Sequence, residues 1–223
     1  MFKKAIAFYW LLVFLELIVT LFDLTTINFF VKPLLMPALI VLLLQGANPI
    51  KEKKIVLIGL ICAWLGDTFL LFETKDPLFF IAGLASFLLT HVCYIIYFLR
   101  LRVSSISMLK KQPIIILLVI AYGAGLFIFL NPYLGDLKIP VLVYAIVICS
   151  MLLCAVHIYS RVNEPSNKLY VAGALFFVVS DSLLAINKFY MPLFLSHSSI
   201  MLTYCMAQYF IVSGCVREKL SAR

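Results

Sequence analysis

The chain has 223 residues, of which 65% are hydrophobic and only 13% are charged, and its mean hydropathy is +1.12. This composition excludes a soluble globular domain and indicates a membrane protein with several spanning helices. The formal net charge of +8 does not indicate nucleic-acid binding, because the basic residues are scattered between apolar segments, where they orient a chain in the lipid bilayer. The six cysteines show no CxxC or Cys/His metal spacing and are interpreted as small apolar residues.

Eight apolar segments are long enough to cross a membrane, which takes about 17 to 25 residues. The first segment follows Lys3 and Lys4 as in a signal peptide, but no small-residue cleavage site follows, so we expect an uncleaved helix. Turn and charge signals such as Asn131-Pro132 separate the segments. The expected fold is an all-α bundle of eight transmembrane helices, in a single membrane domain over residues 1–223. The segments cover residues 5–22, 29–46, 55–72, 78–99, 114–130, 139–159, 169–187 and 194–215.

Basic residues gather at one set of helix ends. Of the 18 lysines and arginines, 14 lie at the ends that include both chain termini. Because positive charge is retained on the cytoplasmic side, we expect both termini in the cytoplasm, and an even number of helices agrees with this. We expect the host to be a bacterial inner (plasma) membrane. The larger set is Lys3, Lys4, Lys51, Lys53, Lys54, Arg100, Arg102, Lys110, Lys111, Arg161, Lys168, Arg217, Lys219 and Arg223; the smaller is Lys32, Lys75, Lys138 and Lys188.

The two halves of the sequence resemble each other, which predicts an internal repeat of four helices plus four. Asp67 in the third segment corresponds to Asp181 in the seventh. Tyr94 follows Asp67 by 27 residues, and Gln208 follows Asp181 by the same 27 residues. Such a parallel duplication places a pseudo-two-fold axis along the membrane normal.

Two aspartates lie inside apolar segments in matching surroundings, GDTFLL around Asp67 and SDSLLA around Asp181. A charged side chain at the centre of a bilayer costs about 2.5–3.5 kcal/mol on insertion scales, so it is rarely kept without a use. Both segments run outward from the cytoplasmic side, which predicts a paired acidic site in the outer half of the bundle. Glu16 falls at a similar depth, and Lys32 marks the outer start of the second helix, so both are expected to join the site.

Other polar side chains are expected to line the same site. His91 on the fourth segment lies deeper than the aspartates, and Pro33 and Pro37 are expected to kink or locally unwind the second helix, which makes room for a cavity. As an alternative, each aspartate is only a packing partner for Lys32, and the tyrosines only bridge helices through hydrogen bonds. The candidate substrate-binding or supporting residues are Lys32, His91, Tyr94, Tyr144, Ser180, Tyr204 and Gln208.

Paired carboxyls favour acid–base chemistry. Two neighbouring carboxyls in a dry site do not both ionise, so one remains a proton donor and the other a carboxylate. Acid-assisted cleavage through an oxocarbenium-like state uses this arrangement. The sequence has no GxSxG, no HExxH and no glycine-rich phosphate loop, and we expect neither a metal nor an organic cofactor.

Five short motifs occur in order along nearly the whole chain. They are KPLLMP at 32–37, GDTFL at 66–70, GLASF at 83–87 followed by His91 and Tyr94, GALFF at 173–177 with SDSLLA at 180–185, and YCMAQ at 204–208. The ordered set resembles the YhhN family of multi-pass membrane proteins, whose characterised animal members are lysoplasmalogenases. The resemblance implies hydrolysis of the vinyl ether bond of a lysoplasmalogen, a lysophospholipid, to a fatty aldehyde and a glycerophospho-base.

The paired acids and the resemblance together predict a mechanism. One protonated aspartate, Asp67 or Asp181, delivers a proton to the vinyl ether, and the other stabilises the resulting cation and activates water. Lys32 binds the phosphate or tunes an aspartate. A rival function of another class is proton-coupled transport of a small solute, which buried acids and an internal repeat would also suit. Transport needs access from both faces and broken helices, whereas a lipid hydrolase needs one opening and an apolar tunnel.

Overall fold

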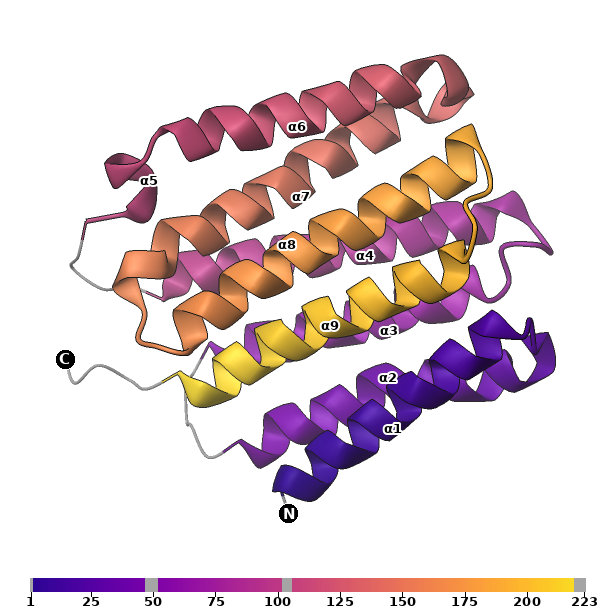
Figure 1. The fold of residues 1–223 in the computed structure, drawn as a ribbon, viewed down its shortest axis with the longest axis horizontal. Coiled ribbons are helices and arrows are strands. Elements are labelled where there is room, and N and C mark those ends of the chain that lie inside the picture. The colour runs from indigo at the N-terminus through magenta and orange to yellow at the C-terminus, as the bar shows by residue number, and fades with distance from the viewer. Residues whose placement is uncertain (1, 47–51, 102–105, 219–223) are drawn as a thin grey trace.

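A computed structural model describes residues 2–46, 52–101 and 106–218, and all regular structure in these ranges is helical. The all-α class expected from the sequence is therefore confirmed for the described residues. The long helices lie side by side in one bundle, with their axes roughly parallel or antiparallel (Figure 1). They are α1 (Phe2–Leu21), α2 (Thr25–Gln45), α3 (Lys53–Leu70), α4 (Pro77–Arg100), α6 (Ile114–Leu130), α7 (Lys138–Ile158), α8 (Ser166–Ala185) and α9 (Ser196–Arg217).

Short elements fill several of the connections between these helices. One is α5, a single helical turn that precedes α6, and another is η4, a π-helical turn that continues α8. The sequence had predicted neither. The short elements are α5 (Met108–Lys111), η1 (Asn131–Tyr133), η2 (Gly135–Leu137), η3 (Tyr159–Arg161) and η4 (Ile186–Tyr190). Four of the basic residues assigned above to the helix ends, Lys51, Arg102, Lys219 and Arg223, lie outside the described residues.

The described chain is that of an integral membrane protein. Seven of its helical stretches are long and apolar enough to cross a membrane. Each of these stretches has a window of 18 residues with at most two charged side chains. The remaining long helix, α3, has only 18 residues and carries three charges, Lys53, Lys54 and Asp67. It packs beside α2 and α4 within the bundle. Its crossing of the membrane, and hence the total of eight, stays a prediction.

The order of the helices across the bundle determines which of them can share a site. α6 forms one edge and packs on α7, whereas α1 and α2 form the opposite edge (Figure 1). α9 contacts α8, α1 and α2, and α4 contacts α3 and α7. The first turn of α1 and the last turn of α9 lie at the same end of the bundle, as an even helix count predicts. Which side of the membrane that end faces stays a prediction.

The start of α2 differs from the prediction. Asp23, whose φ of 50° lies in the left-handed region, reverses the chain directly after α1. α2 consequently begins at Thr25, and Lys32 lies two turns inside the helix rather than at its start. A kink or a local unwinding was expected at Pro33 and Pro37. The unwinding is wrong, because α2 stays helical through both residues, and the kink stays a prediction.

A hydrogen bond from α3 explains why α2 tolerates Pro37. Pro37 has no N–H, which leaves the carbonyl of Pro33 without its usual helical donor. The indole N–H of Trp64 donates to this carbonyl at 2.9 Å. In lipid an unpaired backbone group costs several kcal/mol, so the cross-helix bond stabilises α2 and ties it to α3.

Small residues allow the helices that carry the aspartates to pack closely on their neighbours. A Cβ added to Gly173 of α8 would lie 2.9 Å from the carbonyl oxygen of Ala207 on α9. A Cβ added to Gly66 of α3 would lie 2.9 Å from the ring of Phe87 on α4. These contacts hold α8 against α9 and α3 against α4. The two pairs occupy corresponding places in the two halves, although the internal repeat itself stays a prediction.

Candidate active site

A cavity of about 500 Å³ lies among α1, α2, α3, α8 and α9, near the helix ends that are opposite the first turn of α1. The charged residues that were expected to converge, Glu16, Lys32, Asp67 and Asp181, all line it. Tyr204 lines it too. Both aspartates therefore face one common space, although they belong to different halves of the chain.

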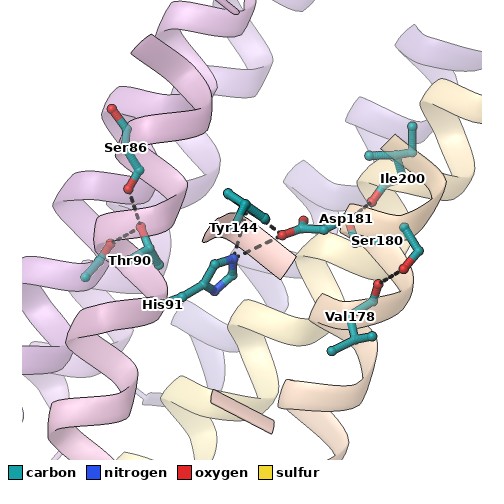
Figure 2. Close-up of polar contacts among 10 residues, drawn as sticks. Ser86, Thr90, His91, Tyr144, Val178, Ser180, Asp181 and Ile200 are labelled. Carbon is teal, nitrogen blue, oxygen red and sulfur yellow. Dashed lines mark hydrogen bonds and ion pairs between the residues drawn. The ribbon is translucent and has the colours of Figure 1, made fainter. Parts of the chain in front are cut away.

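Asp181 belongs to a hydrogen-bonded cluster built by three helices. Its Oδ2 accepts a hydrogen bond from the Tyr144 hydroxyl of α7 at 2.5 Å and lies 3.0 Å from the His91 Nε2 of α4. Nε2 is also 3.0 Å from the Tyr144 hydroxyl. Figure 2 shows the imidazole directed toward both partners. Either group can be the donor of the contact between His91 and Asp181: Nε2–H donates to an ionised Asp181, and a protonated Asp181 donates to Nε2.

Aromatic rings enclose the imidazole of His91. The ring is fully buried, and it packs edge-on against Phe177 at 4.8 Å and against Tyr144 at 5.4 Å between centroids. Nδ1 has no hydrogen-bond partner among the described residues. With Nε2 at 3.0 Å from Asp181 Oδ2, His91 is placed to exchange a proton with this carboxyl.

Asp67 has a different partner. Its Oδ2 accepts a hydrogen bond from the Tyr204 hydroxyl of α9 at 2.7 Å. Asp67 is 2% exposed, whereas the Asp181 side chain is 14% exposed. The Phe177 ring packs against Tyr204 at 5.7 Å and against His91 at 4.8 Å, so it separates the two clusters. The two carboxyls thus share a cavity but have distinct environments.

Three other predicted residues bridge helices. The Tyr94 hydroxyl of α4 donates to Gln208 Oε1 of α9 at 2.5 Å, and both side chains are fully buried behind the cavity rather than lining it. The Ser180 hydroxyl donates to the Ile200 carbonyl oxygen at 3.1 Å and ties α8 to α9 where both line the cavity. For Tyr94 and Gln208 the structure fits the helix-bridging alternative.

Sequence reasoning missed the role of two lysines. Lys75 and Lys188 line the cavity with Lys32, and we call these three residues the lysine rim. Lys188 forms an ion pair with Glu73 at 3.1 Å and lies 4.5 Å from the centroid of the Phe80 ring. Both lysines come shortly after the helices that carry the aspartates. We had used this position in the sequence only to predict which ends of the helices are cytoplasmic. Lys32 makes no ion pair within 4 Å and no hydrogen bond among the described residues.

Two polar side chains at the α1–α2 side of the cavity, the buried Glu16 and the half-buried Asn28, have buried oxygens without a partner among the described residues. Both carboxyl oxygens of Glu16 lack a hydrogen-bond partner within the described part of the chain, and so does the Oδ1 of Asn28. Asn28 was missed, although Thr25, Asn28 and Lys32 follow helical spacing and share one face of α2. Over the described ranges, no three His, Cys, Asp or Glu side chains form a group that would hold a metal ion.

Asp181 also reaches two small apolar spaces on the other side of α8. One, of about 60 Å³, lies between α6, α7 and α8, and we call it the α6 cleft. The other, of about 40 Å³, lies beside Phe80 and Phe189. Both include Asp181 and Tyr144 in their walls, and neither includes Asp67.

Comparison with known proteins agrees with the motif order. The sequence profile of the YhhN family matches residues 27–215. The chain belongs to the YhhN family. The resemblance expected from the sequence is thereby confirmed, and it covers all of the helices that line the cavity except α1 and the start of α2.

Relatives with an assigned activity are similar over most of the chain. Lysoplasmalogenase TMEM86B of Homo sapiens is 30% identical over 161 residues, which are 72% of this chain and 62% of that protein. The lysoplasmalogenase of Mycobacterium bovis is 30% identical over 162 residues, 68% of this chain and 59% of that protein. The matched part thus spans about six tenths of the length of these relatives. No solved structure matches the chain.

Proposed function

We propose that this YhhN-family protein is a lysoplasmalogenase-like hydrolase. It cleaves the vinyl ether bond of a lysoplasmalogen and releases a fatty aldehyde and a glycerophospho-base. The observation that carries the proposal is that Asp67 and Asp181 line one cavity while each accepts a hydrogen bond from a different tyrosine. The activity in the names of the relatives supplies the reaction class. The host is a bacterial inner (plasma) membrane, with both termini in the cytoplasm.

The reaction begins with proton transfer from one aspartate to the β-carbon of the vinyl ether, which converts the α-carbon and the ether oxygen to an oxocarbenium ion. The other aspartate, as a carboxylate, stabilises this cation and takes a proton from the water that attacks the α-carbon. The resulting hemiacetal collapses to the aldehyde and the alcohol. One water is consumed, and the two carboxyls regain their starting states when one proton passes between them.

The different environments of the two carboxyls support this division of work. Acid and base roles separate when two titratable groups have unlike surroundings. Asp181 Oδ2 lies 3.0 Å from His91 Nε2 and accepts a hydrogen bond from Tyr144, whereas Asp67 has Tyr204 as its hydrogen-bond donor.

The lysine rim supports an anionic headgroup as ligand. Lys32 has no ion-pair partner within 4 Å among the described residues and lines the cavity, so its ammonium is available to a phosphate. The unpaired oxygens of Glu16 and Asn28 accept hydrogen bonds from the ammonium or the hydroxyl groups of the same headgroup. The cavity thus offers groups of both signs to a zwitterionic lysophospholipid.

Proton-coupled transport, the rival function, is less well supported. Transporters bind their solutes where spanning helices are broken. Here α2 stays helical through Pro33 and Pro37, and the relatives are named for a hydrolase activity.

The test is to incubate the purified protein with a lysoplasmalogen and, separately, with a 1-acyl lysophospholipid, and to measure aldehyde. We expect aldehyde from the first substrate only. Asp67→Asn and Asp181→Asn should each lower turnover by about 10²–10⁴, the usual contribution of a general acid or base. The variants should keep the thermal unfolding midpoint of the unchanged protein, because the amide retains the size of the carboxyl.

Asp136→Asn is the matched control, because Asp136 is exposed in the link between α6 and α7 and does not line the cavity. Its turnover should equal that of the unchanged protein. Full activity of Asp67→Asn and Asp181→Asn would refute the two-carboxyl mechanism, and the absence of aldehyde from the unchanged protein would refute the hydrolase itself.

A further inference from the structure

We infer that the hydrocarbon chain of the substrate lies in the α6 cleft, at the lipid-facing edge of the bundle, so that Asp181 rather than Asp67 is the proton donor. This inference rests on the proposed function. The cavity and the cleft meet at one carboxyl side chain: Asp181 lines both, whereas Asp67 lines only the cavity. Among the described residues, no other acidic side chain and no basic one lies in the walls of the cleft.

The walls of the α6 cleft are suited to a hydrocarbon. They include Leu126, Phe127 and Ile148, and its polar members are paired with one another. The Tyr122 hydroxyl donates to Ser182 Oγ at 2.8 Å, and Ser182 in turn donates to a backbone carbonyl of its own helix at 2.6 Å. Both hydroxyl hydrogens of this pair are thus engaged within the protein, so the cleft favours apolar contacts.

The position of the cleft allows entry from the bilayer. α6 is an edge helix that has Leu130 as its buried residue, and its outer face is exposed (Figure 1). A cleft of about 60 Å³ accommodates the first carbons of a chain and not its whole length. The rest of the chain therefore stays among the lipid chains, and the headgroup enters the larger cavity on the other side of Asp181.

The chemistry of the vinyl ether agrees with this placement. From the headgroup outward, the substrate consists of glycerol, the ether oxygen, the α-carbon, the β-carbon and the rest of the hydrocarbon chain. The β-carbon, which accepts the proton, is therefore on the chain side of the vinyl ether. A chain in the α6 cleft brings the β-carbon next to Asp181 and its partner His91. The α-carbon then faces the cavity, where Asp67 is placed to take the proton of the attacking water.

A second apolar groove is the competing position for the chain. It has about 440 Å³ between α1 and α2, and Phe8, Leu34 and Val41 line it. Neither aspartate lines this groove. A chain placed there would leave the vinyl ether without a proton donor, which is why we place the chain in the smaller α6 cleft.

The first test fills the cleft. Ala145 of α7 lines it, and Ala145→Phe should exclude the first carbons of the chain. We expect the ratio of kcat/KM for a long-chain alkenyl substrate to that for a propenyl substrate to fall about tenfold, the effect of losing roughly two buried methylene groups. Ala121→Phe, at an exposed position of α6 outside the cleft, should leave this ratio unchanged. An unchanged ratio in Ala145→Phe would refute the inference.

The second test does not need turnover. An uncleavable alkyl-ether lysophosphoethanolamine with a diazirine close to the ether oxygen is photolysed with the unchanged protein, and the labelled peptides are mapped. Label in 122–130 and 141–149 supports the inference, and label on α1 and α2 overturns it. If the unchanged protein releases no aldehyde but the label is in the α6 cleft, the hydrolase proposal fails while the chain site stands.

Discussion

Tyr144 is the residue through which the Asp181 cluster is most easily tested. Its hydroxyl donates to Asp181 Oδ2 at 2.5 Å and lies 3.0 Å from His91 Nε2, so it holds the carboxyl and the imidazole in one geometry. Tyr144→Phe removes the hydroxyl and keeps the ring. We expect kcat to fall about ten- to a hundredfold, the loss of one hydrogen bond to the carboxylate that Asp181 becomes as it gives up its proton. KM should change little, and aldehyde release measures both constants.

The matched control at this scale is Tyr122→Phe. Tyr122 also lines the α6 cleft, but its hydroxyl donates to Ser182 rather than to Asp181. Its kcat should stay within a few-fold of that of the unchanged protein. Equal losses in the two variants would mean that the Tyr144 hydroxyl only supports packing.

At the residue scale, the sequence predicted the costly groups but not their partners. Asp67 and Asp181 were predictable because a charge within an apolar segment is expensive wherever the helices pack. The pairing of Asp181 with His91 and Tyr144 depends on three separate helices and their rotation, which no local pattern specifies. Lys188 was recognised as a basic helix end, but its contacts with Glu73 and Phe80 are tertiary and had no signal in the sequence.

At the scale of elements, the contact of α8 with α9 depends on Gly173. A Cβ there would lie 2.7 Å from Ile211 Cγ1 and 2.9 Å from the Ala207 carbonyl oxygen. This oxygen belongs to the backbone of α9, so a change of side-chain rotamer cannot relieve the contact. Gly173→Ala should therefore destabilise the protein by about 1–3 kcal/mol, the usual cost of overpacking. Thermal unfolding in detergent measures this effect.

Gly125→Ala provides the comparison. Gly125 lies on α6, and a Cβ added there meets nothing within 4 Å. Because alanine favours a helix over glycine by about 1 kcal/mol, this variant should unfold at the same temperature or a higher one. A Gly173→Ala protein that is as stable as Gly125→Ala would show that α8 and α9 separate without cost.

Helix segments were predictable from the sequence, whereas their ends were less so. Apolar length located each long helix, because a span of the bilayer needs a minimum number of residues. The start of α2 was misplaced, since Thr25 and Asn28 are polar, and their position in the cavity wall is a tertiary effect. The unwinding expected at Pro33 did not occur because Trp64, on another helix, supplies the missing donor.

At the scale of the whole molecule, the polar pairs of the site cross between the two halves of the chain. Asp67 of the first half is bound by Tyr204 of the second, and Asp181 of the second half by His91 of the first. Tyr94 and Gln208, the matched pair of the proposed repeat, are bonded to each other. A pseudo-two-fold axis between α4 and α9 would produce this pattern. The repeat itself stays a prediction.

The two proposed compartments also follow from the order of helices across the bundle. The larger cavity lies toward α1 and α2 and carries the lysine rim, whereas the α6 cleft lies at the opposite edge and is apolar. α8 stands between them and carries Asp181. A lysophospholipid, with a charged headgroup and one hydrocarbon chain, has the same division of polarity along its length.

The orientation of the bundle decides which leaflet supplies the substrate. The lysine rim and the cavity lie at the ends opposite the first turn of α1, together with Lys138. The positive charge concentrated at the other ends predicts that those ends are cytoplasmic. The described members of that set are Lys3, Lys4, Lys53, Lys54, Arg100, Lys110, Lys111, Arg161, Lys168 and Arg217. The cavity is then at the outer face, and the headgroup is drawn from the outer leaflet.

Labelling with a membrane-impermeant maleimide tests this orientation at two exposed positions, Asp136 between α6 and α7 and Lys110 in α5. Asp136→Cys should react in cells whose inner membrane is intact, and Lys110→Cys only after that membrane is opened. The unchanged protein measures the background from its six cysteines, which are buried or half-buried. The reverse pattern would place the cavity at the cytoplasmic face, and the substrate would then come from the inner leaflet.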